Sequence, residues 1–366
     1  MDVFEMIRIA AARGASDLHL FVSSRPVLRI NGTLRPLAHF QSLTDDDIKT
    51  ALNQLTSEEN RAEFKERLEL DFSYTLTDYS RIRCNVAMQC GTVNLTIRLV
   101  PLEIPTLEEL GLPEVCKELV VRRRGLIIVS GPTGSGKSTT LTAMINYLNG
   151  IENRRVITVE DPVEYVYISD KCAITQRELG RDTSSFATAL KYSLRQDPDV
   201  ILVGEMRDTE TVTSVLTAAE TGHLVLTTSH AATVSQAVER LIDLFPPHER
   251  PQIQAQLASL VLGILCQRLV PKADDSGRAP AVEIMLTNPA IRNLIREGKT
   301  YQLTNVIRTQ AQSGMILLDQ ALANLYNRGV ISGESLYAFC NDENDVEKLT
   351  SRVKEATRKV KEAAPA

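Results

Sequence analysis

The chain has 366 residues, a formal net charge of −5 and a hydrophobic fraction of 43%. This length is enough for two domains with a sizeable core. The acidic balance argues against nucleic acid as the main partner, because nucleic-acid-binding proteins carry a basic surface. No apolar run is long enough to span a membrane, and no signal peptide is expected at the N-terminus. Six cysteines without a C-x-x-C pair exclude the usual zinc pattern and suggest reduced thiols in a cytosol.

Residues 1–100 are predicted to form a small α/β unit. Asn31-Gly32 lies between two apolar runs and predicts a β-hairpin, because this dipeptide favours the tight turn. Two later strands carry arginines at alternating positions, Arg81 and Arg83 on one and Arg98 on the other. The other expected elements are a helix at 3–11, strands at 16–21, 80–88 and 93–100, and helical structure at 44–69.

A proline-marked segment from Pro101 to Pro113 is expected to form the linker, assigned to residues 101–115. Beyond it, continuous apolar runs alternate with helical patterns, as in a parallel sheet that is buried on both faces. This alternation predicts a doubly wound α/β core within residues 116–345. The expected strands are 125–130, 156–159, 199–203 and 223–227.

From about residue 248 onward the pattern predicts helices. An apolar stripe indicates a helix face, and the most apolar stretch, Leu257 to Leu269, is predicted to be a core helix. The charged tail, residues 346–366, is expected to form a weakly packed helix. The stripe consists of Ile253, Leu257, Leu260, Val261, Ile264 and Leu265.

Residues 131–138, Gly-Pro-Thr-Gly-Ser-Gly-Lys-Ser, match the phosphate-loop pattern G-x-x-x-x-G-K-[ST]. They follow an apolar strand and precede a helical pattern, and these flanks argue against a simple Gly/Ser-rich surface turn. Backbone N–H groups and the helix N-terminus would cradle phosphates, Lys137 would reach the β- and γ-phosphates, and Ser138 would hold Mg²⁺. The expected nucleotide-binding residues here are Gly131, Pro132, Thr133, Gly134, Ser135, Gly136, Lys137, Ser138 and Thr139.

Carboxylates follow two of the core strands. Glu160, Asp161 and Glu164 end one strand, where ligands bind in open α/β sheets, and one of them could activate the attacking water. A solvated acidic turn is the alternative. Glu205 follows Gly204 at the end of another strand, where most phosphate-loop enzymes carry an acid that binds Mg²⁺ through water.

Two histidines bracket the predicted strand near residues 224–228. A lone histidine is more often a structural residue than a reactive one, and this interpretation is kept for His223. His230 lies at the other end of the strand, nearer the predicted nucleotide face, where it could sense the γ-phosphate.

Several segments in collinear order, from residue 1 to about 340, resemble the secretion ATPases, which are hexameric motors of type II and type IV secretion and of type IV pili. The tetracysteine insertion and extra N-terminal domain of the assembly ATPases are lacking. Ala290–Glu297, Ala-Ile-Arg-Asn-Leu-Ile-Arg-Glu, resembles the signature of twitching-motility (PilT-like) retraction ATPases. The other matching segments are Ala15-Ser-Asp-Leu-His19, the phosphate loop, 159–164, 197–205 and the paired-histidine box.

The resemblance implies a PAS-like N-terminal domain, a RecA-like phosphate-loop ATPase domain and a homohexameric ring. It also implies roles for individual residues. Glu164 would be the catalytic base, Glu205 would act at Mg²⁺, and His230, with His223 as the second candidate, would couple nucleotide state to movement. The histidine box, Thr227-Thr-Ser-His-Ala231, departs from the family's Gly-Thr-Leu-His-Thr, which leaves the coupling role less secure than the hydrolytic one.

Arginines complete the implied site. Arg83 and Arg98, with Arg81 as a substitute, would reach phosphates as the domains close, and Arg278 would touch nucleotide. For any single strand arginine, a solvated sheet face is the alternative.

The implied function is Mg-dependent ATP hydrolysis that powers pilus retraction, in the cytoplasm at the inner-membrane base of the pilus. ATP and Mg²⁺ are the expected cofactors. The expected partners are further copies of the chain, an inner-membrane pilus platform protein and a paralogous retraction ATPase, with no nucleic acid.

Three alternatives stay open. The first is an accessory retraction paralogue or a related secretion or DNA-uptake ATPase. The second is a DNA-translocating RecA-type ATPase, which the acidic balance disfavours. The third is a non-catalytic scaffold, which Lys137, Ser138, Glu164 and Glu205 disfavour.

Overall fold

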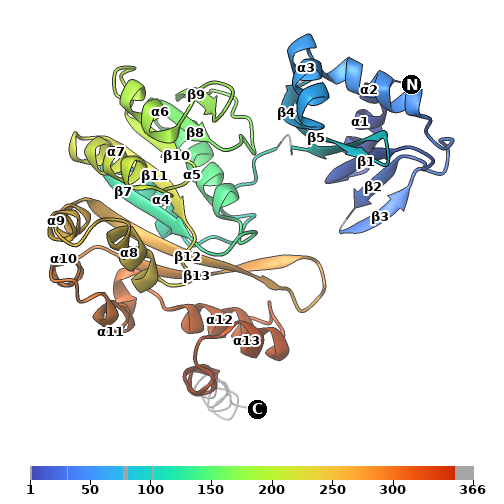
Figure 1. Ribbon diagram of the computed structural model, residues 1–366. Coiled ribbons are helices and arrows are strands. Elements are labelled where there is room, and N and C mark those ends of the chain that lie inside the picture. Colours follow the sequence, from blue (N-terminus) through green and yellow to red (C-terminus); the bar gives the residue numbers. More distant parts are fainter. Residues whose placement is uncertain (1, 31, 77–80, 101–102, 351–366) are drawn as a thin grey trace, which may run out of the picture. The chain divides into compact units, whose positions relative to one another are not determined.

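The computed structural model describes residues 2–30, 32–76, 81–100 and 103–350 (Figure 1). The chain divides into two compact units, the first made of Met1–Glu103 and Glu164–Val166 and the second of Ile104–Val163 and Tyr167–Ala366. Within the described ranges, none of the helices combines the length and the apolar character that crossing a membrane requires.

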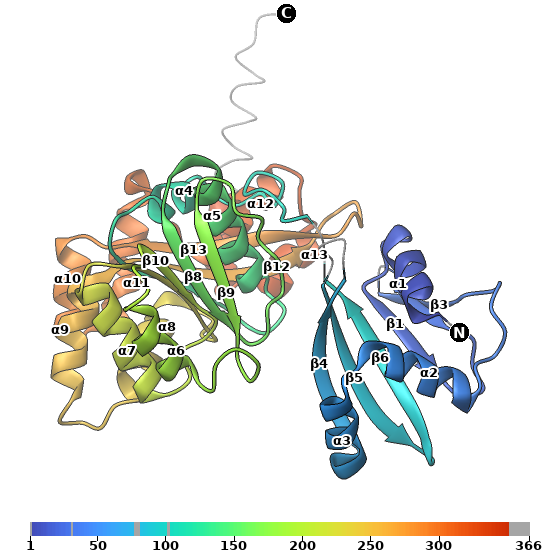
Figure 2. The same ribbon diagram turned by 90° about the horizontal axis from the view of Figure 1, so that it is seen from above.

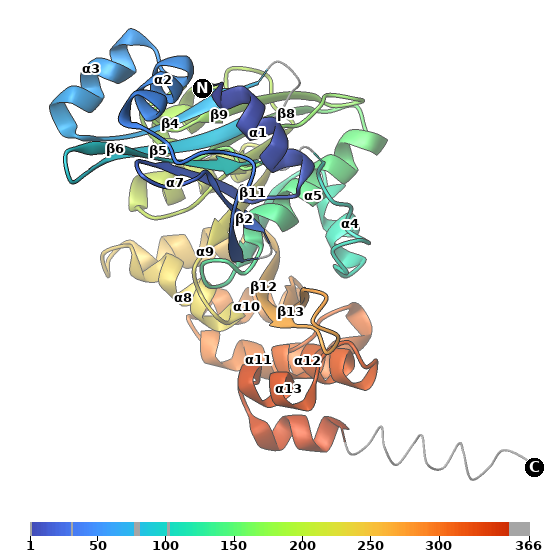
Figure 3. The same cartoon turned by 90° about the vertical axis from the view of Figure 1, so that its right-hand side faces the viewer.

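The first unit is a six-stranded antiparallel sheet in the order β3-β2-β1-β6-β5-β4. Alternate strand residues such as Leu18, Leu95 and Ile97 join the helices α1 and α2 in one buried cluster, so these helices cover a single face (Figure 3). The elements are α1 (Val3–Ala12), β1 (Asp17–Phe21), β2 (Val27–Ile30), β3 (Thr33–Pro36), α2 (Asp45–Leu55), α3 (Glu58–Arg67), β4 (Glu69–Thr75), β5 (Arg81–Gln89) and β6 (Thr92–Leu99).

Most predicted elements of this unit are confirmed. The hairpin exists as β2 and β3, although Asn31 itself lies outside the described residues. The predicted helical region 44–69 consists of two helices, because Ser57 and Asn60 form a capping box that starts α3 shortly after α2 ends. Strand β4 was missed.

The second unit is built on a seven-stranded sheet in the order β13-β12-β7-β11-β10-β8-β9, parallel except for β13. Helices cover both of its faces (Figure 2). In the central strand β7, Leu126 and Ile128 pack in one buried cluster, whereas Ile127 and Val129 pack in another, with α4 and α5. The sheet is therefore doubly wound, and the predicted α/β class is confirmed.

The strands of this unit are β7 (Gly125–Ser130), β8 (Arg155–Glu160), β9 (Ala173–Glu178), β10 (Val200–Val203), β11 (Leu224–Ser229), β12 (Val261–Pro271) and β13 (Arg278–Leu286). Its helices are α4 (Val115–Val120), α5 (Lys137–Ile151), α6 (Phe186–Ser193), α7 (Thr209–Glu220), α8 (Val234–Asp243), α9 (Arg250–Leu260), α10 (Pro289–Arg296), α11 (Leu303–Thr309), α12 (Leu318–Asn327) and α13 (Gly333–Phe339). Two short 3₁₀ turns are η1 (Thr300–Gln302) and η2 (Ala311–Ser313).

The four core strands predicted from apolar runs are present as β7, β8, β10 and β11, but the continuous helical region after residue 248 is wrong. Helix α9 ends at Leu260, and Val261–Pro271 is strand β12, which pairs with β7 and β13. A short apolar run that is buried on both faces has no distinguishing period, so its pattern fits a buried strand as well as a helix.

The C-terminal helices α12 and α13 pack in a separate cluster with Val270, Ala279 and Ala281 of the β12–β13 hairpin. Residues 343–350 are helical, and Val346 is fully buried in the same cluster. The rest of the predicted tail, 351–366, lies outside the described residues.

Candidate functional site

The phosphate loop joins β7 to α5, and its glycines allow a tight curve. Gly131 and Gly136 adopt φ values of 146° and 85°, which residues with a side chain rarely adopt. A Cβ atom on Gly131 would lie 2.3 Å from the backbone oxygen of Gln267 and 2.6 Å from Ser135 Oγ. The loop can take this path only with glycine at these positions.

Lys137 begins α5 and is buried beneath the loop. Its Nζ donates hydrogen bonds to the carbonyl oxygens of Gly131 (2.9 Å) and Pro132 (3.0 Å). The nearby Ser135 Oγ is buried and has no hydrogen-bond partner among the described residues. A cationic ammonium, an unsatisfied hydroxyl and a glycine cradle at a helix N-terminus fit a phosphate group.

The register of the parallel strands brings several predicted residues to the edge where the loop lies. Ser130 pairs with Ser229, so His230 follows the neighbouring strand at the same level as the loop. Val203 pairs with both Thr227 and Val159, which places Glu205 and Glu160 at this edge as well. Ligands bind at this edge in doubly wound sheets.

Glu205 is held by two cationic or potentially cationic neighbours. Its Oε1 lies 2.9 Å from His230 Nε2, and its Oε2 lies 2.7 Å from an Arg207 guanidinium nitrogen. Burial alone raises the pKa of Glu205, but the hydrogen bonds from Arg207 and His230 outweigh it and hold this pKa below its usual range. Glu205 is therefore ionised near neutral pH, which is the form in which a carboxylate can bind a divalent cation.

His223 lies at the opposite end of β11. Its Nδ1 is 2.9 Å from the carbonyl oxygen of Ala218 and 3.1 Å from Thr221 Oγ1, at the C-terminal end of α7. Both contacts hold the turn between α7 and β11, so the geometry favours the structural interpretation that the sequence gave to this histidine.

The three carboxylates at and after the end of β8 have different surroundings. Glu160 is buried and accepts hydrogen bonds from Thr158 Oγ1 (2.6 Å) and Gln176 Nε2 (3.1 Å). Asp161 and Glu164 are exposed. Glu160 thus ties β8 to β9, while the other two have carboxylates accessible to water.

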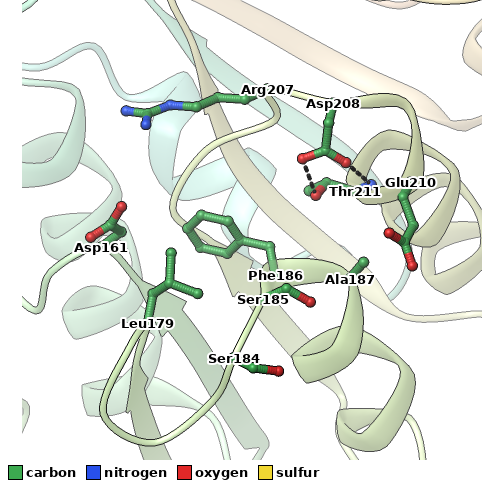
Figure 4. Close-up of a pocket in the computed structure, with 10 residues that line it drawn as sticks. All are labelled: Asp161, Leu179, Ser184, Ser185, Phe186, Ala187, Arg207, Asp208, Glu210 and Thr211. Atoms are coloured by element: carbon green, nitrogen blue, oxygen red, sulfur yellow. Dashed lines mark hydrogen bonds between the residues drawn. The ribbon is translucent and has the colours of Figure 1, made fainter.

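A pocket of about 280 Å³ opens beside Arg207, between the start of α6 and the start of α7 (Figure 4). Asp208 caps α7 by accepting from the backbone N–H and the hydroxyl of Thr211, at 2.7 and 2.9 Å. Asp161 lies across the pocket from Asp208 (Figure 4). Glu205 is the main cause of the raised pKa of Arg207, and the negative charge of Asp161 adds to it. Arg207 is therefore paired with a carboxylate of the site and lines a pocket that Asp161, Asp208 and apolar side chains such as Phe186 also line.

In the first unit, a row of charged residues crosses four strands on the face away from its core. In the strand register, Arg83 lies opposite Arg98, Arg98 lies opposite Asp17, and Asp17 lies opposite Arg29. Arg98 Nε donates to Asp17 Oδ1 at 2.9 Å. Burial raises the pKa of Asp17, but hydrogen bonds from Arg98 and Ser16 outweigh it and lower this pKa overall. Asp17 was not predicted as a partner of Arg98, although it lies in the Ala15–His19 segment.

The remaining predicted arginines are exposed or partly exposed. Arg278 is exposed and begins β13 at the tip of the β12–β13 hairpin, opposite Pro271. In the signature helix α10, Ile291 and Ile295 are buried, and Arg292 donates to the carbonyl oxygen of Ser259 at 3.1 Å. Arg296 is exposed.

This fold and the loop at its sheet edge define a phosphate-loop nucleotide-binding protein. A family model described as type II/IV secretion system protein matches residues 2–298. The chain belongs to this family.

Individual relatives cover nearly the whole chain. It is 42% identical to the type IV pilus retractation ATPase PilT of Pseudomonas aeruginosa over 335 residues, which span 92% of this chain and 97% of the relative. It is 38% identical to the type IV pilus ATPase PilU of the same organism, with 94% and 90% covered. The crystal structure of the pilus retraction motor PilT with bound ADP matches with a TM-score of 0.89 and 42% identity, over 95% of this chain and 99% of that one. The predicted resemblance to PilT-like ATPases is confirmed.

Proposed function

We propose that the chain is a Mg²⁺-dependent ATPase that powers retraction of a type IV pilus. The observation that carries this proposal is the 42% identity to PilT across 92% of the chain, with 97% of that relative covered. The phosphate loop, the ionised Glu205 and the strand-end carboxylates supply the parts that phosphoryl transfer to water needs.

Each predicted residue of the hydrolytic site has a distinct task in this proposal. Loop residues 131–139 bind the phosphates through their backbone N–H groups, and the Lys137 ammonium moves from the loop carbonyls to the β- and γ-phosphates. Ser138 and Glu205 would hold Mg²⁺, which would neutralise phosphate charge when bound. Glu164 orients water and accepts its proton.

Residues outside the loop would complete the nucleotide site and couple its state to movement. Arg83 and Arg98 would bring positive charge to the phosphates as the domains close, and Arg278 would contact nucleotide from its hairpin. His230 and Arg207 both contact the carboxylate of Glu205. A shift of this carboxylate on nucleotide binding would therefore act directly on His230. We assign the coupling of nucleotide state to movement to His230.

The assembly is proposed from the family resemblance. The chain would form a homohexameric ring in the cytoplasm at the base of the pilus and bind an inner-membrane platform protein. A paralogous retraction ATPase is a further candidate partner, because Pseudomonas aeruginosa carries both PilT and PilU, and both are similar to this chain.

A deletion strain tests the function. Cells that lack the main retraction motor are expected to be hyperpiliated and unable to twitch, and the wild-type gene should restore both properties. A second candidate function, an accessory retraction ATPase, is favoured by the 38% identity to PilU over 94% of the chain. It predicts a strain that still twitches but less than wild type, whereas unchanged piliation and motility would contradict both functions.

The signature helix α10 provides a test that separates retraction from hydrolysis. Arg296→Ala is expected to leave ATP hydrolysis within about twofold of wild type, since an exposed surface substitution changes stability little, while twitching is impaired. Arg292→Ala should act similarly but also lower thermal stability, because Arg292 ties α10 to α9 through Ser259. Loss of hydrolysis in purified Arg296→Ala would instead mark α10 as part of the ATPase structure.

A further inference from the structure

Gln267 is a buried polar residue that lies directly beside the phosphate loop. It belongs to β12, whose Cys266 pairs with Ser130 of β7, so Gln267 follows at the level where the loop begins. Its exposed fraction is 3%. A polar side chain is rarely buried to this extent unless it makes hydrogen bonds.

Both ends of the Gln267 amide are in use. Nε2 donates to the carbonyl oxygen of Ser135, within the loop, at 2.8 Å. Oε1 accepts from Thr140 Oγ1, in the first turn of α5, at 2.8 Å. The neutral amide supplies a donor at one end and an acceptor at the other, and the reverse orientation would set two oxygens against each other at Ser135.

The shape of the loop also depends on this residue. A Cβ atom on Gly131 would meet the Gln267 backbone oxygen, and one on Gly136 would lie 2.9 Å from Gln267 Nε2. Two glycines of the phosphate-loop pattern therefore face Gln267, one its backbone and the other its side chain. Gln267 fills the space on which the loop rests.

We propose that Gln267 is a positioning residue for nucleotide binding. It fixes the curve of loop 131–136 relative to the start of α5, so that the loop N–H groups and Lys137 converge on the phosphates. The free energy for ordering the loop is then supplied during folding rather than at binding, which increases affinity. This inference rests on the proposed ATPase function, since ATP and ADP are its ligands.

Three variants of the full-length chain test it. Gln267→Met keeps the volume and removes both hydrogen bonds. Gln267→Glu keeps the acceptor for Thr140 and places a second oxygen against Ser135. Thr140→Val removes one of the two bonds and leaves the loop contact intact. The measurements are Kd for ATP and ADP by calorimetry, kcat and KM for hydrolysis, and Tm without nucleotide.

Gln267→Met is expected to raise Kd and KM by roughly 10- to 100-fold, as the loss of buried hydrogen bonds implies, with a smaller change in kcat. Thr140→Val should show a weaker effect in the same direction. Gln267→Glu should bind poorly at pH 8 and recover as the pH falls, because the protonated carboxyl regains a donor for Ser135. Wild-type protein measured in parallel removes any general effect of pH.

Two results would show that Gln267 only fills the core. One is a Gln267→Met variant with wild-type Kd values, whether or not its Tm is lowered. The other is a Gln267→Glu variant whose nucleotide affinity does not depend on pH more than that of the wild type. If Gln267→Met does not fold, Thr140→Val and Gln267→Glu decide by the same criteria. Failure of the pilus function is distinguishable, because wild-type protein would then still bind ATP while the deletion strain showed normal piliation and twitching. A wild-type chain that binds no nucleotide would overturn both.

Discussion

Lys137→Ala is expected to abolish ATP hydrolysis and to weaken nucleotide binding strongly. The Lys137 ammonium is buried beneath the loop, 2.9 and 3.0 Å from the carbonyl oxygens of Gly131 and Pro132, at the place where phosphates would bind. Alanine removes the cation that offsets charge on the transferred phosphoryl group, and loss of one such group costs roughly 100- to 1,000-fold in kcat. Phosphate release by the purified protein with saturating Mg²⁺ and ATP measures the change.

An exposed lysine provides the matched control. Lys191→Ala on α6 removes the same charge and the same side-chain atoms from the surface, so wild-type turnover is expected. If Lys137→Ala hydrolysed ATP at the wild-type rate, residues 131–138 would not form the catalytic phosphate site. An equal loss in both variants would instead point to a general effect of charge on the assembly.

The parallel core could be predicted because its strands are buried on both faces. Val200–Val203 is a continuous apolar strand between polar segments, and such a run matches a buried parallel strand. The loop could be predicted because its chemistry is local: its glycines, Lys137 and Ser138 lie within eight residues of sequence. Strand register then brings His230 and Glu205 to the same edge, a relation that follows from the fold class.

Strand β12 could not be predicted from the pattern. It directly follows α9, and its apolar residues continue the helical stripe, so the periodicity gives no sign of the change at Val261. Pairing with β7 decides the structure there, and pairing is a long-range interaction. Gln267 was missed for the same reason, because it lies 132 residues from Ser135 in sequence and meets it only through the sheet.

The charged row in the first unit is an intermediate case. Alternation along β5 and β6 was visible in the sequence, and in the structure Arg83 and Arg98 lie on the face of the sheet opposite the core. That Asp17 binds Arg98 depends on β1 pairing with β6, because these two residues lie 81 positions apart in the sequence. Local patterns give the face of a side chain, while its partner depends on which strands pair.

Glu164→Gln is expected to abolish turnover and to leave ATP binding unchanged. Glutamine has nearly the same shape as glutamate but cannot take a proton from water, and loss of a general base costs roughly 100- to 10,000-fold in rate. Single-turnover hydrolysis and calorimetric ATP binding, measured on the same preparation, separate the chemical step from affinity. Wild-type turnover in this variant would remove Glu164 from the mechanism.

Variants of the neighbouring carboxylates test the assignment of Glu164 as the general base, because a different effect is expected for each variant. Glu160→Gln should lower Tm and affect catalysis only secondarily, since Glu160 is buried and accepts from Thr158 and Gln176. Asp161→Asn changes an exposed side chain of the same acidic segment and should retain turnover. If Asp161→Asn abolished turnover and Glu164→Gln did not, the base would be Asp161. Equal, partial losses in both variants would indicate that the acidic segment acts through its combined negative charge rather than through one general base. A general base must contact the attacking water, so a neighbouring carboxylate cannot replace it unless the water moves.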